Sequence, residues 1–346
     1  MKRCICSISL EDLQLELRDA GFQKFRASQI LNWVYRNFTL EPDKMLNVPV
    51  GLREFLKENL LASFFEIVDI SHSADGTEKV LINFKQTGDA IESVIIPSRK
   101  RLTFCLSTQV GCPVGCKFCA SGKLGLKRNL SAGEIVAQLI LCSSIAGKKP
   151  DNIVFMGIGE PMLNINNLIK ALHFISDSNY FGMAQRHITV STSGIVKGIL
   201  KLAETGRQYN LAVSLHGPTD DLRAQLIPDN FRESITDIIK ACKLYRKETT
   251  RMVTFEYTLI RDINDSPQHA EQLASLALKT FAKVNLIPFN SVSDTEFKPP
   301  LKESVTSFLN ILLQNDVQAT LRYKRGDDSN AACGQLRNRF MNIPNQ

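Results

Sequence analysis

The stretch LTFCLSTQVGCPVGCKFCASG, residues 102–122, decides the fold class of this chain. It begins as an apolar segment typical of a buried strand and continues into a glycine-rich loop with three cysteines, Cys112, Cys116 and Cys119, in the pattern C-x3-C-x2-C. From here onward, strand-like and helix-like segments alternate. Repeated β-α units with buried strands indicate a parallel sheet, and such sheets bind ligands at the carboxyl ends of their strands.

The spacing of the three cysteines favours an iron–sulfur cluster. One short loop can present three thiolates to a four-iron cluster and leave the fourth iron without a protein ligand, whereas such clusters are otherwise held by four cysteines. An open iron can chelate S-adenosylmethionine and pass it one electron. The alternatives are a zinc knuckle or three unrelated cysteines. A structural zinc site needs a fourth Cys or His, and no histidine lies in this loop.

The strand-like segments are LTFCLS, NIVFMG, HITVS, LAVSLH, VTFEYTLI, VNLIPF and VQATLR. Helical patterns lie between them, among them SAGEIVAQLILCSSIA, NNLIKALHFISDS, ESITDIIKACKLYRK, SPQHAEQLASLALK and KESVTSFLNILLQN. About six such units favour a partial, TIM-like (β/α)6 barrel over a full eight-stranded one. No glycine-rich dinucleotide fingerprint follows any strand, so a Rossmann fold lacks support. The predicted fold class is α/β.

Two smaller regions precede the predicted barrel core at residues 98–346. Residues 1–65 have apolar residues at helical spacing, in LEDLQLELRDAGF and RASQILNWVYRNF, and predict a small helical domain. This domain is either a cap on the core or an RNA-gripping module, and the sequence slightly favours the cap. Residues 66–97 contain the segments EIVDIS, KVLINF and AIESVIIP, which predict a short β extension.

Composition and charge narrow the class of protein. The 346 residues are 44% hydrophobic, which is ordinary for a soluble globular chain. No apolar run approaches the roughly 18 residues of a membrane helix, and Glu11 and Asp12 interrupt the amino-terminal segment before a secretion signal could form. Nine cysteines without such a signal indicate reduced thiols, so we expect a cytoplasmic protein with no membrane contact.

The net charge of +7 is unevenly distributed. Basic residues gather in three groups: Arg99, Lys100 and Arg101; Lys123, Lys127 and Arg128; and Arg322, Lys324, Arg325, Arg337 and Arg339. Any one group is explained by ordinary solvated surface charge. Three groups that each border a chemical motif favour a polyanionic substrate, and we expect a nucleic acid.

Polar residues follow the strand-like segments at corresponding positions. They are Gly159 and Glu160, Ser191, Ser214 and His216, and Asn290. Most of them have an ordinary structural explanation, such as a helix N-cap or a structural histidine, but a plain turn does not explain the acidic Glu160 between Gly159 and Pro161. Because the carboxyl ends of parallel strands meet at one edge, we expect these residues to form a single site that faces the cysteine loop.

Two further cysteines differ in their surroundings. Cys105 lies on the first strand and would by itself be a buried small hydrophobe. Cys333 lies in RGDDSNAACGQL between Ala332 and Gly334, which leaves it sterically open and suits a nucleophile. The remaining cysteines, Cys4, Cys6, Cys142 and Cys242, are predicted to have no catalytic role.

Taken together, CLSTQVGCPVGCKFCASG, GIGEPMLN, ITVSTSG, VSLHGP, LIPFN and RGDDSNAACGQL resemble the RlmN/Cfr group of radical S-adenosylmethionine RNA methyltransferases over residues 90–337. The resemblance implies a 4Fe–4S cluster bound by Cys112, Cys116 and Cys119. It implies an S-adenosylmethionine site formed by Gly159, Glu160, Ser191, Ser214, Leu215, His216 and Asn290. It also implies that Cys333 becomes methylated, that Cys105 is its redox partner, and that Glu92 is the proton acceptor.

The chemistry implied by the resemblance needs both cysteines and two S-adenosylmethionine molecules per turnover. The first molecule methylates Cys333, and the second is cleaved to a radical that removes hydrogen from that methyl group. The sulfur-bound methylene then adds to the adenine carbon. Cys105 attacks Cys333, a transient disulfide bond forms, and the methylated base departs. The target base must be unstacked to reach such a site.

Two features indicate the subfamily. Pro161 after Glu160, and the run Arg325-Gly326-Asp327-Asp328, resemble the members that methylate carbon 2 of an adenosine in 23S rRNA and an adenosine next to the anticodon in tRNA. The resemblance also implies a monomer served by an electron donor such as flavodoxin or ferredoxin. The alternatives are Cfr-like methylation of carbon 8, a radical enzyme with a non-RNA substrate, and an RNA-binding protein with a structural metal loop.

One departure from the family pattern lies next to the predicted nucleophile. The pair Ser329-Asn330 stands where the family usually has Ile-Asp. We therefore expect the loop that carries Cys333 to be positioned slightly differently in this chain.

Overall fold

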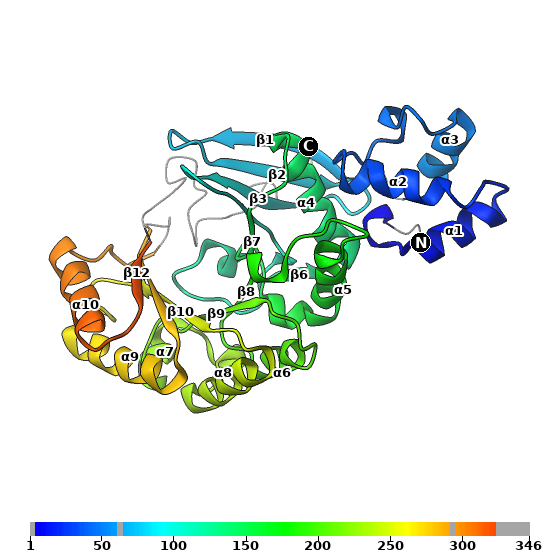
Figure 1. The fold of residues 1–346 in the computed structure, drawn as a ribbon. Coiled ribbons are helices and arrows are strands. Elements are labelled where there is room, and N and C mark those ends of the chain that lie inside the picture. Colours follow the sequence, from blue (N-terminus) through cyan, green and yellow to red (C-terminus); the bar gives the residue numbers. More distant parts are fainter. Residues whose placement is uncertain (1–3, 61–64, 291–294, 323–346) are drawn as a thin grey trace.

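A single ten-stranded sheet organises the chain (Figure 1). The computed structural model describes residues 4–60, 65–290 and 295–322. The strand order across the sheet is β1-β2-β3-β4-β7-β8-β9-β10-β11-β12. The strands are β1 (Phe65–His72), β2 (Glu78–Phe84), β3 (Asp89–Pro97), β4 (Leu102–Cys105), β7 (Asn152–Phe155), β8 (Ile188–Thr192), β9 (Asn210–Ser214), β10 (Val253–Leu259), β11 (Lys283–Pro288) and β12 (Ala319–Leu321).

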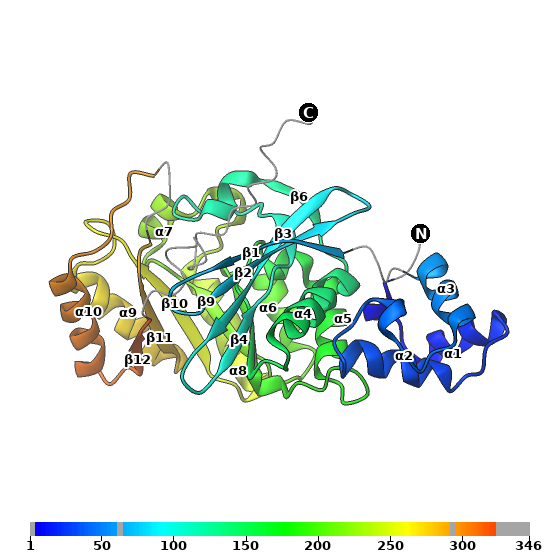
Figure 2. The ribbon, with the colours of Figure 1, turned by 90° about the horizontal axis from the view of Figure 1, so that it is seen from above.

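The part of the sheet from β4 to β12 is parallel throughout. Helices connect these strands and cover the outer face of the curved sheet (Figures 1 and 2). They are α4 (Ala132–Ala146), α5 (Ile165–Ser176), α6 (Val196–Ala203), α7 (Asp220–Leu226), α8 (Ile235–Thr249), α9 (Pro267–Thr280) and α10 (Lys302–Gln314). Six β-α units followed by the short β12 confirm the predicted partial barrel.

The predicted β extension joins the edge of the barrel. Strands β1, β2 and β3 pair antiparallel, and β3 pairs antiparallel with β4, the first barrel strand. A separate two-stranded hairpin of β5 (Gln109–Gly111) and β6 (Leu126–Asn129) brackets the cysteine loop. The sequence analysis did not predict this hairpin, because three- and four-residue strands are too short to show a period.

The amino-terminal region is helical, as predicted. It contains the short 3-10 helix η1 (Ile5–Ser7) and the helices α1 (Leu10–Asp19), α2 (Arg26–Tyr35) and α3 (Val50–Asn59). Gly21, which separates α1 from α2, has a φ of +82°, a conformation that glycine adopts at little cost. These helices lie beside α4 and α5, away from the rest of the barrel (Figures 1 and 2).

Specific contacts attach this helical region to the barrel. The Arg36 guanidinium donates to the Tyr180 carbonyl over 2.6 Å and to the Ser178 carbonyl over 2.7 Å. Apolar residues of the helices, the extension and the barrel form one continuous core. The proposed domain boundaries near residues 65 and 97 therefore remain predictions. Among the described residues, no helix has both the length and the apolar content needed to cross a membrane.

Candidate active site

A cavity of about 170 Å³ opens at the carboxyl ends of the parallel strands. Its wall contains nine of the residues predicted from the sequence: Cys112, Cys116, Cys119, Gly159, Glu160, Ser191, Ser214, His216 and Asn290. These residues come from the carboxyl ends of four strands, β7, β8, β9 and β11, and from the cysteine loop. The expectation that they form one site is therefore matched by the geometry, while the chemical role of each residue stays a prediction.

The hairpin of β5 and β6 closes the cysteine loop at its base. The Cys112 amide donates to the Gly125 carbonyl over 2.8 Å, and the Cys119 amide donates to the Cys116 carbonyl over 3.1 Å. Gly111 has a φ of +77°, and a Cβ there would lie 1.9 Å from the Gly125 carbonyl oxygen. Only glycine fits at this crossing, so the sequence Gly-Cys at 111–112 follows from the tight turn.

The donor set of this loop fits an iron–sulfur cluster. Burial raises the pKa of Cys112 to about 12. Burial also raises the pKa of Cys116 well above its ordinary value, and the neighbouring thiols Cys119 and Cys112 raise it further. Three clustered thiols therefore ionise together only if a cation neutralises them, as the irons of a cluster do.

A single metal ion fits the loop less well. No group of three His, Cys, Asp or Glu side chains within the described part of the chain converges on one point where a metal ion would sit. A structural zinc ion needs four ligands around one centre. In a four-iron cluster each thiolate binds a different iron, so the ligands lie farther apart. With three cysteines and no histidine, the loop itself supplies only three of the four ligands that a zinc knuckle needs.

The turn after β7 holds Glu160 against the cavity. Gly159 has a φ of +109°, and a Cβ there would lie 2.6 Å from the Gln109 Cβ, so glycine is required. Glu160 is 4% exposed. Its carboxylate accepts hydrogen bonds from the Met162 amide over 3.0 Å and from the Ser193 amide over 2.7 Å.

The ionisation of Glu160 reflects two opposing effects. Burial raises the pKa of this carboxyl above its ordinary value, and the hydrogen bonds from the Ser193 and Met162 amides counteract part of that rise. A carboxylate has about four lone-pair positions. Glu160 can therefore still accept hydrogen bonds from an ammonium group of a ligand in the cavity.

His216 is held as a neutral imidazole. Its Nδ1 accepts a hydrogen bond from the Thr258 amide over 3.0 Å, so the ring proton lies on Nε2. Burial, aided by the charge of Arg223, lowers the pKa of His216 to about 3. Its backbone φ of +55° is unusual for a residue other than glycine and marks local strain. His216 can donate a hydrogen bond at neutral pH, but it cannot carry a positive charge there.

Arg223 on α7 is a functional candidate that the sequence analysis missed. It is fully buried, and it donates to the Leu215 carbonyl over 2.7 Å and to the Ser193 carbonyl over 3.0 Å. It thereby joins the turns that follow β8 and β9. The Leu215 side chain lies in the core and not in the cavity wall. Any contact of Leu215 with a ligand would have to use its backbone.

Three predicted catalytic residues lie outside the cavity wall or outside the described residues. Cys105 is 7% exposed and packs against Val94 and Ile158 beside the cavity. Glu92 is buried on β3, with its carboxylate 3.3 Å from the Lys79 ammonium group. Cys333 lies outside the described residues. No disulfide joins any two of the eight described cysteines, so the transient pairing of Cys105 with Cys333 stays a prediction.

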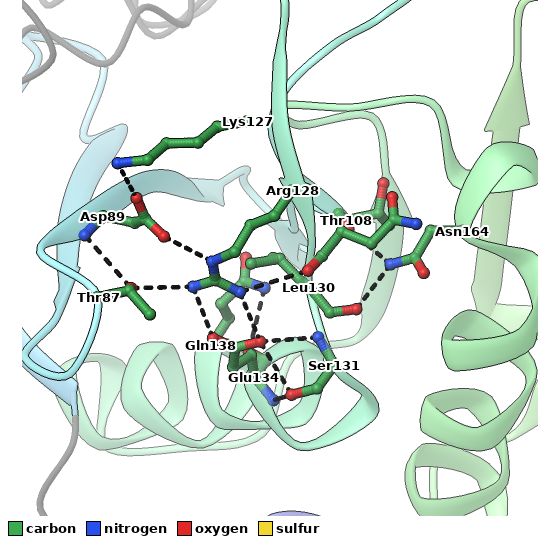
Figure 3. A network of polar contacts seen from close by, with 11 residues as sticks. Thr87, Asp89, Thr108, Lys127, Arg128, Leu130, Ser131, Glu134, Gln138 and Asn164 are labelled. Atoms are coloured by element: carbon green, nitrogen blue, oxygen red, sulfur yellow. Dashed lines mark hydrogen bonds and ion pairs between the residues drawn. The ribbon is translucent and has the colours of Figure 1, made fainter.

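Lys127 and Arg128, which the sequence analysis placed in a basic group expected to face a polyanionic substrate, have partners within the protein. Both side chains bind the buried carboxylate of Asp89, and each contact measures 2.5 Å (Figure 3). Arg128 also contacts the Glu134 carboxylate over 2.8 Å and donates to the Thr87 hydroxyl over 3.3 Å. Arg128 is therefore engaged within the protein, so phosphate binding by Arg128 would have to replace these contacts and stays a prediction.

The other two basic groups differ in their position relative to the cavity. One lies away from it, and the other reaches it at Arg322. Arg99, Lys100 and Arg101 are exposed and precede β4, so they lie at the amino-terminal edge of the parallel sheet, opposite the cavity. Proximity in sequence to the cysteine loop was misleading, because β4 runs between the two. Arg322 lines the cavity, while the remaining carboxy-terminal basic residues lie beyond the described part of the chain.

The cavity residues that the sequence analysis did not assign to the site include Glu256, Thr258 and Phe289. Glu256 offered a signal in the sequence, because it is the only charged residue in the apolar strand segment VTFEYTLI. A charged residue in a buried strand needs a partner or a ligand.

An open α/β barrel whose cysteine loop faces polar strand ends defines the class of radical S-adenosylmethionine enzymes. Residues 106–274 match the family described as the Radical SAM superfamily. Residues 5–61 match the family described as the Ribosomal RNA large subunit methyltransferase N-terminal domain.

Relatives extend this match to nearly the whole chain. A protein of Akkermansia muciniphila named "Probable dual-specificity RNA methyltransferase RlmN" is 46% identical over 335 residues, which cover 94% of this chain and 93% of that protein. A protein of Caldicellulosiruptor saccharolyticus with the same name is 42% identical and covers 99% of both chains. The crystal structure of a radical SAM methyltransferase from Sphaerobacter thermophilus has a TM-score of 0.93 and 42% identity, covering 97% of this chain and 99% of that one.

The chain belongs to the RlmN family of radical S-adenosylmethionine RNA methyltransferases. As a member of this family it uses a 4Fe–4S cluster and S-adenosylmethionine.

Proposed function

We propose that this enzyme methylates carbon 2 of an adenosine in 23S rRNA and of an adenosine in tRNA, by way of a methylated Cys333. The observation that carries the proposal is the shared cavity, in which the three thiols of the cysteine loop face Glu160, Ser214 and His216. The relatives named dual-specificity RNA methyltransferases support it. The proposed enzyme is a cytoplasmic monomer that receives electrons from a donor such as flavodoxin or ferredoxin.

The cavity residues have distinct proposed roles. Cys112, Cys116 and Cys119 hold the cluster, which, when bound, supplies the electron that cleaves S-adenosylmethionine. Glu160 accepts hydrogen bonds from the ammonium group of the bound cofactor, because its carboxylate retains acceptor capacity. The neutral His216 donates from Nε2.

The proposed proton acceptor and resolving thiol share one edge of the barrel. Cys105 on β4 pairs with Val94 on β3, and Glu92 lies two residues before Val94 on the same face of that strand. The Lys79 ammonium group lies 3.3 Å from the Glu92 carboxylate and holds it on this edge. Arg322, the last described residue, lines the cavity, so the chain leaves the described part at the cavity itself. The proposed mechanism requires Cys333, which lies outside the described residues, to reach both groups.

Mass spectrometry of nucleosides from rRNA and tRNA tests the proposal. A strain that lacks the gene should lose 2-methyladenosine from both RNAs. The wild-type gene should restore it, and the Cys112→Ala variant should not. If the wild-type gene instead produced 8-methyladenosine, the result would support the Cfr-like alternative. Restoration in rRNA alone would remove tRNA from the proposed substrates.

A further inference from the structure

A buried carboxylate lies on the inner face of the barrel, below the strand ends. Glu256 is in the middle of β10 and is only 4% exposed. Barrel interiors are usually filled by branched aliphatic side chains. A carboxylate at such a position is costly unless its oxygens are matched by donors.

Glu256 belongs to a polar row that crosses three strands. The parallel register pairs it with Ser214 on β9 and with Asn285 on β11. Residues that pair at the same level of a parallel sheet point to the same face. The row therefore faces the barrel interior, and Ser214 and Glu256 both line the cavity that contains the cysteine loop.

The two oxygens of the Glu256 carboxylate have different surroundings. Oε1 accepts a hydrogen bond from the Asn285 amide nitrogen over 3.0 Å. Oε2 is buried and receives no hydrogen bond from any described residue. Burial raises the pKa of this carboxyl, and the charge of Arg322 and the Asn285 hydrogen bond counteract part of that rise. One acceptor in the cavity wall is thus left without a donor.

The position of the cysteine loop determines which part of the cofactor can reach this acceptor. The amino and carboxylate groups of S-adenosylmethionine are the chelating groups, so they must lie at the cluster. Its nucleoside end then lies elsewhere in the same cavity, whose wall includes Ser214 and Glu256. That end carries O–H donors on the ribose and N–H donors on the adenine.

We propose that the Glu256 carboxylate accepts a hydrogen bond from the nucleoside end of S-adenosylmethionine and thereby contributes to cofactor affinity. The proposal rests on the assignment of this cavity to the cofactor. It assigns a ligand-binding role to a cavity residue that belongs to none of the motifs found in the sequence.

A competing explanation is hydration. Glu256 also lines a second cavity of about 290 Å³ beneath the first, together with Asn210, Arg251 and Lys283. Water in that polar cavity could satisfy Oε2 without any cofactor. The two explanations differ in whether removal of the carboxylate changes cofactor binding.

The test measures binding to anaerobically reconstituted protein in the absence of RNA. Glu256→Leu removes both acceptors, and Glu256→Gln keeps the shape but removes the charge. Equilibrium dialysis with S-adenosylmethionine should give about tenfold to hundredfold weaker binding for Glu256→Leu, the range for a hydrogen bond to a charged group. The loss for Glu256→Gln should be smaller. Binding of 5′-methylthioadenosine should weaken in parallel, while binding of methionine should stay unchanged.

Two controls separate a local effect from misfolding. Iron content per chain should equal that of the wild type in both variants, and Glu204→Gln, at an exposed glutamate after α6, should bind the cofactor normally. If Glu256→Leu does not fold, Glu256→Gln decides the question because it preserves the side-chain volume. Wild-type cofactor affinity in a folded variant would overturn the proposal in favour of hydration. Unchanged cofactor affinity with a raised KM for RNA would instead assign the acceptor to the target adenosine and would equally overturn it.

Because RNA is absent from the binding assay, this result is independent of the RNA product. A wild-type enzyme that forms no 2-methyladenosine would refute the proposed function without changing the measured cofactor affinities.

Discussion

Two regions of this protein bury a carboxylate, and they differ in the partners that they provide for its two oxygens. In the network around Asp89, each carboxylate oxygen contacts a cation, from Lys127 or Arg128 (Figure 3). In the cavity, Glu256 has one oxygen without a donor among the described residues. Burial favours a higher pKa in both regions, but hydrogen bonds from Lys127 and Arg128 bring the pKa of Asp89 below its ordinary value. The pKa of Glu256 stays above it.

The comparison shows how structural and ligand-binding charges can be told apart. Arg128 links the β2–β3 turn, strand β6 and the first turn of α4, where Ser131 and Glu134 form a capping box. Its partners are complete within the protein, so the network stabilises the hairpin that brackets the cysteine loop. In the cavity, Glu256 keeps one oxygen without a donor among the described residues, which is what the proposed ligand contact would use.

The largest effect is expected at the cysteine loop. Cys112→Ala should reduce the iron content to near zero and abolish methylation of Cys333, because a cluster with two remaining protein thiolates is not held. Iron analysis and the absorbance of anaerobically reconstituted protein measure this. Cys242→Ala, at a buried cysteine of α8, should keep its full iron content. A fully iron-loaded Cys112→Ala protein would contradict the assignment of the loop.

The next prediction concerns Cys105, which lies beside the cavity without lining it. Cys105→Ala should still bind the cluster and methylate Cys333, but it should stall with RNA covalently attached to Cys333, because no thiolate remains to release the product. Denaturing electrophoresis of labelled RNA after one turnover, with peptide mass spectrometry of the attachment site, measures this. Free methylated RNA at wild-type yield would show instead that Cys105 is a structural residue.

A smaller effect is expected in the Asp89 network. Arg128→Met should lower the free energy of unfolding by about 2–3 kcal/mol, below the usual range for a fully buried pair, because the Arg128 side chain is 26% exposed. Urea unfolding measures the change. Lys127→Met is the matched control and should cost about 1 kcal/mol or less, because its side chain is 55% exposed and Arg128 still holds Asp89.

The same pair of variants tests the earlier expectation of phosphate binding. If Arg128 bound RNA phosphates, its removal would reduce the log–log salt slope of RNA binding by about 1. The structure predicts an unchanged slope for Arg128→Met at temperatures where the variant is folded. A reduced slope would mean that Arg128 leaves Asp89 when RNA binds.

The smallest effect is a change in pH dependence. The pKa of Asp89 is lower in the folded protein than its ordinary value, so the carboxylate contributes stability above that ordinary value and loses the contribution as the pH falls toward its folded pKa. Asp89→Asn should therefore reduce the decline of unfolding free energy as the pH falls below about 5. An unchanged acid decline in unfolding experiments would show that other carboxylates dominate it.

Sequence patterns alone predicted the elements whose signals are local. The alternation of strand and helix from residue 102 onward predicted all seven parallel strands, because buried strands and amphipathic helices have different periods. The spacing of Cys112, Cys116 and Cys119 and the glycines around Glu160 predicted where the cavity would form. These signals lie within a few residues of one another and need no knowledge of the tertiary contacts.

Only the tertiary structure decided which charged side chains are paired within the protein and which face the cavity. Asp89 and Arg128 are far apart in sequence, and nothing in either local segment indicates that they form an ion pair. Arg223 joins two turns from a third element, and the direction of β4 puts Arg101 at the opposite edge from the cavity. Glu256 was visible in the sequence as a charge within an apolar strand, but its unmatched oxygen depends on the register of β10 with β9 and β11. Local sequence determines periodicity and turn geometry, whereas the pairing of buried polar groups depends on contacts between distant segments that only the folded chain brings together.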